Sequence, residues 1–416
     1  MAQQTPFHDR IAPLVQTGVW KHWSGYLVPP AFQYSIANEY WAIRSAATLL
    51  DTSPLFKYRF RGPGARRVLE RALARDIGRC ALGRAQYTCW CDARGFVLQD
   101  GVALHLEEHE YMLTAAEPAL GYFRSIAREL GVDSAELEIE DQSRAWGILA
   151  LQGPHAHDVL AELTPDASEL RYFGVTRAQV AGVELLISRT GFTGDLGYEL
   201  WIPAASAGLV WDALMRVGEG YGLIPIGTTA LKMARVEAGL LLIGVDFANA
   251  QFCWADAERD TPLELGWGWM LRKLERDGRD FIGRAALESA KREGSSRWTC
   301  VGLAVDWADY ERVYSEAGVL PPRSGLYAET TMSVYRRSDT PWDYAGYASS
   351  FLSSPLLRQP LALAKLPLDL AKPGTEVELE LTVIRRPQNV RARVAKAPFF
   401  NPPRKTAAQL AAGGAA

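Results

Sequence analysis

The sequence is poor in cysteine, with five residues in 416, an odd number at irregular spacings. This pattern argues against a disulfide framework and is typical of free thiols in a reducing compartment. The N-terminal residues contain no basic segment followed by an apolar run, so no secretory signal is expected. No stretch approaches the roughly 18 uninterrupted apolar residues of a membrane-spanning helix. These absences predict a cytoplasmic protein with no membrane partner.

An excess of positive charge is also missing. The 45 Lys and Arg residues are outnumbered by 48 Asp and Glu residues, which leaves a net charge of −3. A protein that binds nucleic acid by neutralising phosphates needs a basic surface, so we expect no nucleic-acid partner. The chain also lacks a P-loop and a G-x-G-x-x-G segment after a strand, which are the usual sequence marks of nucleotide and dinucleotide sites.

Residues that could ligate a metal do not form a recognisable set. Cys89 and Cys91 would point the same way on a strand, but no second cysteine pair follows, and a closed zinc site needs four ligands. The closely spaced histidine pairs, at 105–109 and 155–157, are more typical of solvated turn residues than of ligands. We therefore expect no metal.

What the chain does contain is a set of three glycines between two strand-like segments. Gly191, Gly194 and Gly197 are spaced three apart, as in a tight, repeatedly turning loop. The segment before them, 183–187, has the branched apolar composition of a buried strand, and the segment after them, 198–202, alternates as a half-buried strand does. The pattern predicts a strand, a glycine loop and a second strand.

Glu199 stands near the start of the second strand, among Tyr198, Leu200 and Trp201. Alternation alone favours a solvent-facing carboxylate on the polar side of the strand. The bulky neighbours favour a second interpretation, in which the carboxylate is partly buried and needs hydrogen-bond donors. A ligand with two parallel N–H groups would satisfy both of its oxygens. The residues alone leave both interpretations open.

Two further segments have a readable pattern. The segment 86–104 is typical of a β-hairpin that turns at 92–95, and it carries Asp100 close to the turn. Nearer the N-terminus, the segment 38–50 is typical of a helix.

The glycine stretch at 188–199, S-R-T-G-F-T-G-D-L-G-Y-E, closely resembles the S-R-T-G-Y-T-G-E-D-G-F-E pattern of the folate-binding aminomethyltransferase family, which includes the T-protein of the glycine cleavage system. The segments 222–246, 261–270 and 398–404 resemble other motifs of that family in the same order. The resemblance covers about residues 20–404. It implies an α+β, T-protein-like fold, with mixed α/β subdomains around a central folate channel and a C-terminal β-barrel.

The domain boundaries follow from length, composition and this resemblance. A chain of 416 residues is long for one hydrophobic core. Beyond a charged turn at 291–297 the composition shifts to short β segments. We expect a folate-binding region of two interleaved α/β subdomains at 1–290, a C-terminal β-barrel at 291–404 and a flexible tail at 405–416.

The resemblance also implies the site residues. Glu199 matches the family's glutamate that grips the pterin ring of tetrahydrofolate, and Asp100 matches an aspartate at the reactive edge of the folate. Burial beside aromatic side chains would raise the pKa of Asp100 and make it the catalytic acid or base. Tyr87, Phe173 and Arg235 are expected to bind the folate, which would act as a co-substrate.

Departures from the family pattern concern the one-carbon donor. Pro54 stands where the glycine-cleavage enzyme has a histidine, Gln99 replaces the first aspartate of a pair, and Leu231 replaces an arginine that contacts the folate. Together with 13 tryptophans, these changes favour a demethylase that transfers a methyl group from a small methoxyaromatic or methyl sulfonium donor to N5 of tetrahydrofolate. Tyr26 and Trp90 are expected to line the pocket for that donor.

Two alternatives belong to other functional classes. One is an aminomethyltransferase of a glycine-cleavage-like system, whose donor is a lipoyl arm on a carrier protein. The other is a folate-binding protein without transfer chemistry, because a shared fold does not fix function.

Overall fold

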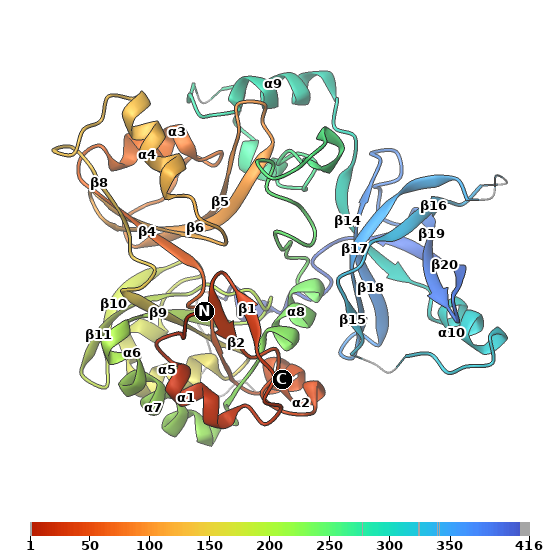
Figure 1. The fold of residues 1–416 in the computed structure, drawn as a ribbon, viewed down its shortest axis with the longest axis horizontal. Helices are drawn as coiled ribbons and strands as arrows, with labels where there is room; N and C mark the ends of the chain where they lie inside the picture. Colours follow the sequence, from red (N-terminus) through yellow and green to blue (C-terminus); the bar gives the residue numbers. More distant parts are fainter. Residues whose placement is uncertain (1, 277, 323–324, 339, 341, 408–416) are drawn as a thin grey trace.

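The computed structural model describes residues 2–407 except 277, 323, 324, 339 and 341. Three β-rich bodies make up the molecule, a six-stranded sheet, a five-stranded sheet and a barrel (Figure 1). A short ribbon of β1 (Lys21–Trp23) and β2 (Tyr26–Val28) precedes them. Of the predicted tail at 405–416, residues 408–416 lie outside the described residues.

The six-stranded sheet contains the glycine loop. Its strand order is β10-β11-β12-β9-β3-β13, and β11 and β12 are the two predicted strands on either side of the loop. The strands are β3 (Thr48–Asp51), β9 (Trp146–Gln152), β10 (Val175–Val180), β11 (Val183–Ser188), β12 (Gly197–Pro203) and β13 (Ile224–Pro225). One face is covered by α1 (His8–Ile11), α5 (Ala156–Leu163), α6 (Pro165–Ser168) and α7 (Ala207–Gly218).

The helix expected at 38–50 is shorter than its pattern indicates. Helix α2 is Ile36–Ser45, and strand β3 begins at Thr48. Thr48 and Leu49 are paired on both sides, with β9 and with β13. Burial between two neighbouring strands therefore overrides the local helical pattern, since these ladder hydrogen bonds come from distant segments.

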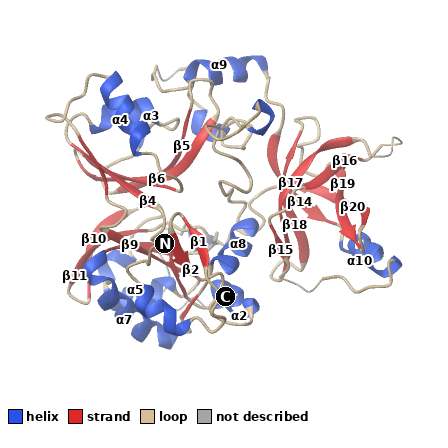
Figure 2. Cartoon of the chain, in the orientation of Figure 1, coloured by secondary structure: helices blue, strands red, loops and turns tan. Residues whose placement is uncertain are grey.

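The five-stranded sheet is inserted in the chain between β3 and β9. Its strand order is β5-β6-β7-β4-β8, and the predicted hairpin is confirmed as the antiparallel pair β5 and β6. The strands are β4 (Phe56–Arg61), β5 (Arg84–Cys91), β6 (Val97–Glu107), β7 (Glu110–Ala115) and β8 (Glu138–Asp141). Helices α3 (Ala65–Ala72) and α4 (Leu120–Glu129) cover one face, so the other face is turned toward the six-stranded sheet (Figure 2).

The C-terminal body is a closed barrel that follows α9 (Arg284–Glu293). The order β17-β16-β19-β20-β14-β18 closes because β18 also pairs with β17, while β15 joins the edge of β17. The strands are β14 (Thr299–Val305), β15 (Tyr327–Ala328), β16 (Met332–Arg336), β17 (Tyr344–Ser354), β18 (Gln359–Leu366), β19 (Glu376–Val383) and β20 (Arg386–Ala395), and α10 (Trp307–Glu316) packs beside them. The expected α+β fold with a C-terminal barrel is confirmed; the domain boundaries stay a prediction.

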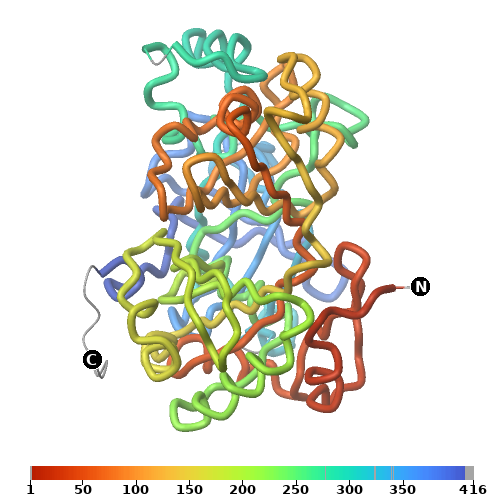
Figure 3. Tube along the Cα trace, turned by 90° about the vertical axis from the view of Figure 1, so that its left-hand side faces the viewer, coloured from red at the N-terminus to blue at the C-terminus, as the bar shows by residue number. Residues whose placement is uncertain are grey.

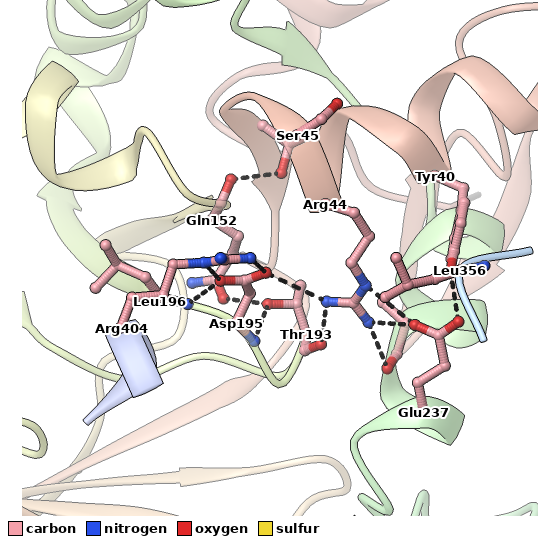
Figure 4. A network of polar contacts seen from close by, with 12 residues as sticks. Tyr40, Arg44, Ser45, Gln152, Thr193, Asp195, Leu196, Glu237, Leu356 and Arg404 are labelled. Carbon is pink, nitrogen blue, oxygen red and sulfur yellow. Dashed lines mark hydrogen bonds and ion pairs between the residues drawn. The ribbon is translucent and has the colours of Figure 1, made fainter. Parts of the chain in front are cut away.

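A buried polar network lies between the elements beside the six-stranded sheet and the segment that follows the barrel (Figure 4). Arg44 of α2 donates from Nε and Nη2 to Glu237 Oε2, at 3.0 and 2.6 Å, and the hydroxyl of Tyr40 donates to Glu237 Oε1. Glu237 ends α8 (Thr228–Glu237). Arg44 also lies 3.7 Å from Asp195 of the glycine loop, which Arg404 binds through both carboxylate oxygens at 2.6 and 2.8 Å. The network holds α2, α8, the glycine loop and the C-terminal segment in one arrangement.

The glycine loop packs too closely against α8 to carry a side chain at Gly194. Gly194 has φ +77°, and a Cβ there would lie 2.4 Å from Cβ of Ala238. We expect Gly194→Ala to lower the free energy of unfolding by about 2–4 kcal/mol, since it combines a left-handed backbone with overpacking. Gly182 is the matched control, because its φ is also +77° but nothing lies within 4 Å of an added Cβ. Urea titrations should give Gly182→Ala a loss of only about 1 kcal/mol; equal losses would contradict the packing argument.

Candidate functional site

A cavity of about 1250 Å³ lies where the two sheets and the barrel meet. Its lining includes Glu199 of β12, Asp100 of β6, Leu363 of β18 and the 240–243 segment after α8. Side chains alternate between the two faces of a strand, so residues on the uncovered faces of both sheets point into the same space. The structure therefore brings the two candidate carboxylates, from strands about 100 residues apart in the chain, into one cavity.

Glu199 faces this cavity rather than the outer surface. It lies opposite Ser188 in the ladder, and the hydroxyl of Thr190 donates to Glu199 Oε2 at 2.5 Å. Thr190 is the only hydrogen-bond partner of the Glu199 carboxylate among the described residues. Burial raises the pKa of Glu199, although the Thr190 hydrogen bond opposes that shift. A half-buried carboxylate with one donor has acceptor capacity left for a ligand.

Asp100 and Tyr87 form a pair on the facing sheet. The Tyr87 hydroxyl donates to Asp100 Oδ2 at 2.8 Å, and the Tyr87 ring meets Trp267 edge to face, with centroids 5.7 Å apart. All three residues line the cavity. Burial raises the pKa of Asp100 to about 6, against the lowering effect of the Tyr87 hydrogen bond. Asp100 can therefore take up or release a proton near neutral pH.

Phe173 also lines the cavity, between the two carboxylate-bearing sheets. Its backbone has φ +60°, and its N–H donates to the carbonyl of Arg189, next to Thr190, at 3.0 Å. Its own carbonyl accepts from the N–H of Ala85 in β5 at 2.8 Å. These two bonds attach the Phe173 loop to both sheets and hold the ring at the cavity wall.

Three residues that were expected to line the site lie elsewhere in the structure, so their predicted roles in the site are corrected here. Trp90 is fully buried against α3 and α4, because it is three residues from Tyr87 and so lies on the opposite face of β5. Arg235 is fully buried in an ion pair with Asp246 and also donates to Ser350 Oγ of β17 at 2.7 Å. It fastens α8 to the barrel.

Tyr26 is the third. It lines a separate pocket of about 220 Å³ with Ser53, Ser143 and Arg144, and is not among the described residues that line the central cavity.

Several residues of the cavity wall were not predicted from the sequence. Thr190 lies within the glycine motif. It comes two residues after Ser188, the last residue of β11, and this spacing was the signal available in the sequence. The cations Arg75, Arg84, Arg171 and Lys405 also line the cavity. No signal in the sequence joins them, because they come from four separate segments.

The cavity fits a flat, hydrogen-bonding ligand of the pterin type. Glu199 offers free acceptor capacity to a pair of N–H donors, and Phe173, Tyr87 and Trp267 offer aromatic surface. Among the described residues, no group of three or more His, Cys, Asp or Glu side chains is placed to hold a metal ion. In the same part of the chain, no helix is long and apolar enough to cross a bilayer.

Known proteins with similar sequences cover nearly the whole chain. The family described as GCVT N-terminal domain matches residues 7–274. An aminomethyltransferase of Saccharopolyspora erythraea is 33% identical over 403 residues, which are 96% of this chain and 98% of that protein. One of Bacillus subtilis is 30% identical over 403 residues, with coverage of 96% and 99%. The crystal structure of glycine cleavage system aminomethyltransferase T from Bartonella henselae has a similar fold, with a TM-score of 0.77, 23% identity, and coverage of 96% and 99%.

These relatives overturn the expected demethylase, because they are named aminomethyltransferases and align over nearly their full length. Two of the departures that favoured a demethylase have packing explanations. Gln99 is buried on the face of β6 away from Asp100, where its Oε1 accepts from the N–H of Glu117 at 3.1 Å. Leu231 packs in an apolar cluster with Ile43. Gln99 therefore does not report on the chemistry of the donor, whereas Leu231 also lines the cavity.

The family match spans well over half of the chain, and the motifs that carried the resemblance form the cavity wall and the network beside it. The expected T-protein-like fold is confirmed by the similarity of the Bartonella henselae structure. The chain therefore belongs to the folate-binding aminomethyltransferase family.

Proposed function

We propose that the protein is a tetrahydrofolate-dependent aminomethyltransferase, which moves a one-carbon unit from a carrier-bound aminomethyl group to N5 of tetrahydrofolate. The observation that carries this proposal is the presence of two different carboxylates in one cavity. Glu199 has one donor and spare acceptor capacity, and Asp100 has a pKa of about 6. The names of the full-length relatives support the class of donor.

Glu199 and Asp100 have different roles in this proposal. Glu199 accepts the two parallel N–H donors of the pterin, while Phe173 and Tyr87 contact its flat faces and edges. Tetrahydrofolate supplies N5 as the atom that receives the one-carbon unit. Asp100 acts as the base that removes the N5 proton as the new N–C bond forms, and holding the reactants together lowers the entropic cost.

The partner is a carrier protein that presents a lipoyl arm. The cavity is larger than a folate headgroup requires, and its barrel side is lined by apolar residues that include Val301, Leu363 and Ala395. An apolar wall suits an alkyl chain that ends in sulfur, because such a chain needs no hydrogen-bond partners. As the new N5–C bond forms, the C–S bond to the aminomethyl group breaks, and the arm takes up the proton removed from N5 and leaves as a thiol. The amino group leaves as ammonia when N10 of the folate bonds to the same carbon and gives up its proton, which produces the methylene-bridged folate.

The test uses a lipoyl carrier protein loaded with an aminomethyl group, whose intact mass is followed over time. We expect the group to be lost only when both the protein and tetrahydrofolate are present. An unloaded carrier should keep its mass throughout. If tetrahydrofolate binds but the loaded carrier never changes, the folate-binding protein without transfer chemistry is the correct function. The absence of a metal requirement and the cytoplasmic location stay predictions.

The pH profile tests the base assigned to Asp100. A base must be deprotonated, and the pKa of Asp100 is about 6. Turnover under saturating substrates should therefore fall as the pH drops through about 6 and level off above about 7. Asp100→Asn should lack this acidic limb in its residual activity. Turnover that rises as the pH falls would assign Asp100 as an acid instead.

A further inference from the structure

The Thr190 hydroxyl that contacts Glu199 has a second hydroxyl behind it. Ser188 Oγ lies 2.7 Å from Thr190 Oγ1, which in turn lies 2.5 Å from Glu199 Oε2. Ser188 is fully buried and Thr190 is 5% exposed. Thr190 and Glu199 line the cavity, whereas Ser188 is absent from its lining among the described residues. We name Ser188 and Thr190 the hydroxyl chain, because together they lead from the interior of the sheet to a carboxylate at the cavity.

The backbone around these two hydroxyls is held on more than one side. Ser188 lies opposite Glu199 in the ladder of β11 and β12. Arg189, between the two hydroxyl residues, is 1% exposed and donates from Nη2 to the carbonyls of Arg404 and Lys405, at 3.1 and 3.3 Å. The C-terminal segment therefore lies against this part of the chain, where Figure 3 shows blue tube beside yellow. The position of the hydroxyl chain follows from the fold and does not need a ligand.

Gln152, the last residue of β9, holds the loop at Thr190. Its side chain is 1% exposed, and its Nε2 donates to the carbonyl of Thr190 at 3.2 Å. A Cβ at Gly191 would lie 2.0 Å from Gln152 Oε1, so the residue after Thr190 must be glycine for this amide to reach the loop. The backbone at Thr190 is therefore fixed, which limits the directions in which its hydroxyl can point.

A hydroxyl carries a single proton, so the charge on Glu199 sets the direction of the hydroxyl chain. An ionised carboxylate only accepts, so Thr190 donates to it and in turn accepts from Ser188. Both hydroxyl protons are then bonded, and each bond strengthens the other. A proton on Oε2 would reverse the chain and leave the Ser188 proton without an acceptor, because Ser188 Oγ has no other partner among the described residues. A buried donor without an acceptor is costly, so the hydroxyl chain favours the ionised form.

The ionised form needs this support because burial disfavours it. Burial is the main cause of the raised pKa of Glu199, and the hydrogen bond from Thr190 is the cause that lowers it. The charged side chains that face the same cavity are Asp100, Arg75, Arg79, Arg84, Arg171, Lys396 and Lys405. None of these described charges is among the causes of the Glu199 pKa shift. The hydroxyl chain is therefore the protein's own means of keeping Glu199 an acceptor.

We propose that Ser188 and Thr190 are positioning residues for the pterin site. They occupy Glu199 Oε2 from behind, keep the carboxylate ionised and leave its other acceptor positions for two parallel N–H groups. This inference rests on the proposed function. Ser188 acts through Thr190 and is not part of the described cavity lining, so its effect does not come from contact with the ligand. The hydroxyl chain therefore sets the pH range in which the folate binds.

The experiment measures the dissociation constant of tetrahydrofolate by titration calorimetry from about pH 5 to about pH 8. All variants carry Asp100→Asn, because Asp100 has a pKa of about 6 and would add its own titration. Glu199 must be ionised to accept the pterin donors, so affinity should fall as the pH falls. Thr190→Val keeps the shape and removes the donor, which raises the pKa of Glu199 further. It should weaken binding near neutral pH by at least about tenfold and move the loss of affinity to higher pH. Thr190→Ser should restore both.

Ser188→Ala tests the hydroxyl chain one residue further from the ligand. It should move the loss of affinity in the same direction by a smaller amount, since Thr190 keeps its contact with Glu199. Thr176→Val is the matched control. Thr176 is a half-exposed residue of β10 in the same sheet, and its hydroxyl donates to the carbonyl of Arg177 at 3.2 Å, outside the cavity lining. It should change neither the affinity nor its pH dependence.

The outcomes separate this inference from the function on which it rests. If the unmodified protein does not bind tetrahydrofolate, the proposed function fails. If the folate binds but Thr190→Val and Ser188→Ala leave the pH dependence unchanged, only this inference fails. A loss of affinity that is equal at every pH would also overturn the inference, because Thr190 would then only shape the cavity wall.

Discussion

Replacing Asp100 with asparagine should lower turnover by about 10²–10⁴-fold, the usual loss when a positioned acid or base is removed. Asparagine keeps the shape of the side chain and can still accept the Tyr87 hydrogen bond, which spans 2.8 Å. It cannot take up a proton from the substrate. Affinity for tetrahydrofolate, measured by calorimetry, should change by less than about tenfold, because the pterin donors are assigned to Glu199.

The control for this variant is Glu108→Gln. Glu108 is an exposed carboxylate in the turn between β6 and β7 of the same sheet, with no side-chain partner among the described residues. Its turnover should match that of the unmodified protein. If Asp100→Asn loses affinity and turnover in equal measure, Asp100 positions the folate rather than moving a proton.

Replacing Glu199 with alanine should weaken tetrahydrofolate binding by at least about 100-fold. Removing one partner of a buried, charge-assisted hydrogen-bonded pair costs roughly 3 kcal/mol or more, and each 1.4 kcal/mol is tenfold in affinity. The free protein should not lose stability. Burial raises the pKa of Glu199, so its ionised form is disfavoured in the folded state, and a neutral residue removes that cost at neutral pH.

Two measurements on one variant therefore separate binding from folding. Thermal unfolding of Glu199→Ala should occur at or above the temperature of the unmodified protein, while calorimetry detects the lost affinity. Glu184→Ala is the control, because Glu184 is an exposed carboxylate on the neighbouring strand β11. A folded Glu199→Ala protein with unchanged folate affinity would remove Glu199 from the site.

The local sequence pattern was sufficient to predict those features of the site that depend only on residues close together in the chain. The glycine spacing predicted the loop between β11 and β12, and the hairpin pattern predicted β5 and β6. It also placed Glu199 and Asp100 on strands beside tight turns, where both lie. These features follow from backbone conformation and two-residue alternation, which a single segment determines by itself.

The local sequence pattern did not determine what each face of a strand or helix contacts in the folded molecule. Trp90 and Tyr87 are both aromatic and three residues apart, and only strand pairing shows that one packs under α4 while the other meets Asp100. The sequence around Arg235 is the same whether its side chain contacts a ligand or Asp246. Only the structure shows that it pairs with Asp246 and donates to Ser350 of the barrel.

The sequence by itself therefore determined the family, the fold class and the two carboxylates of the proposed site. The tertiary structure alone decided which side chains share the cavity, including the cations Arg84, Arg171 and Lys405. The physical reason is the range of the interactions. Turns and alternation depend on residues a few positions apart, whereas a cavity wall is formed by contacts between segments that are more than 200 residues apart, such as Arg189 and Lys405.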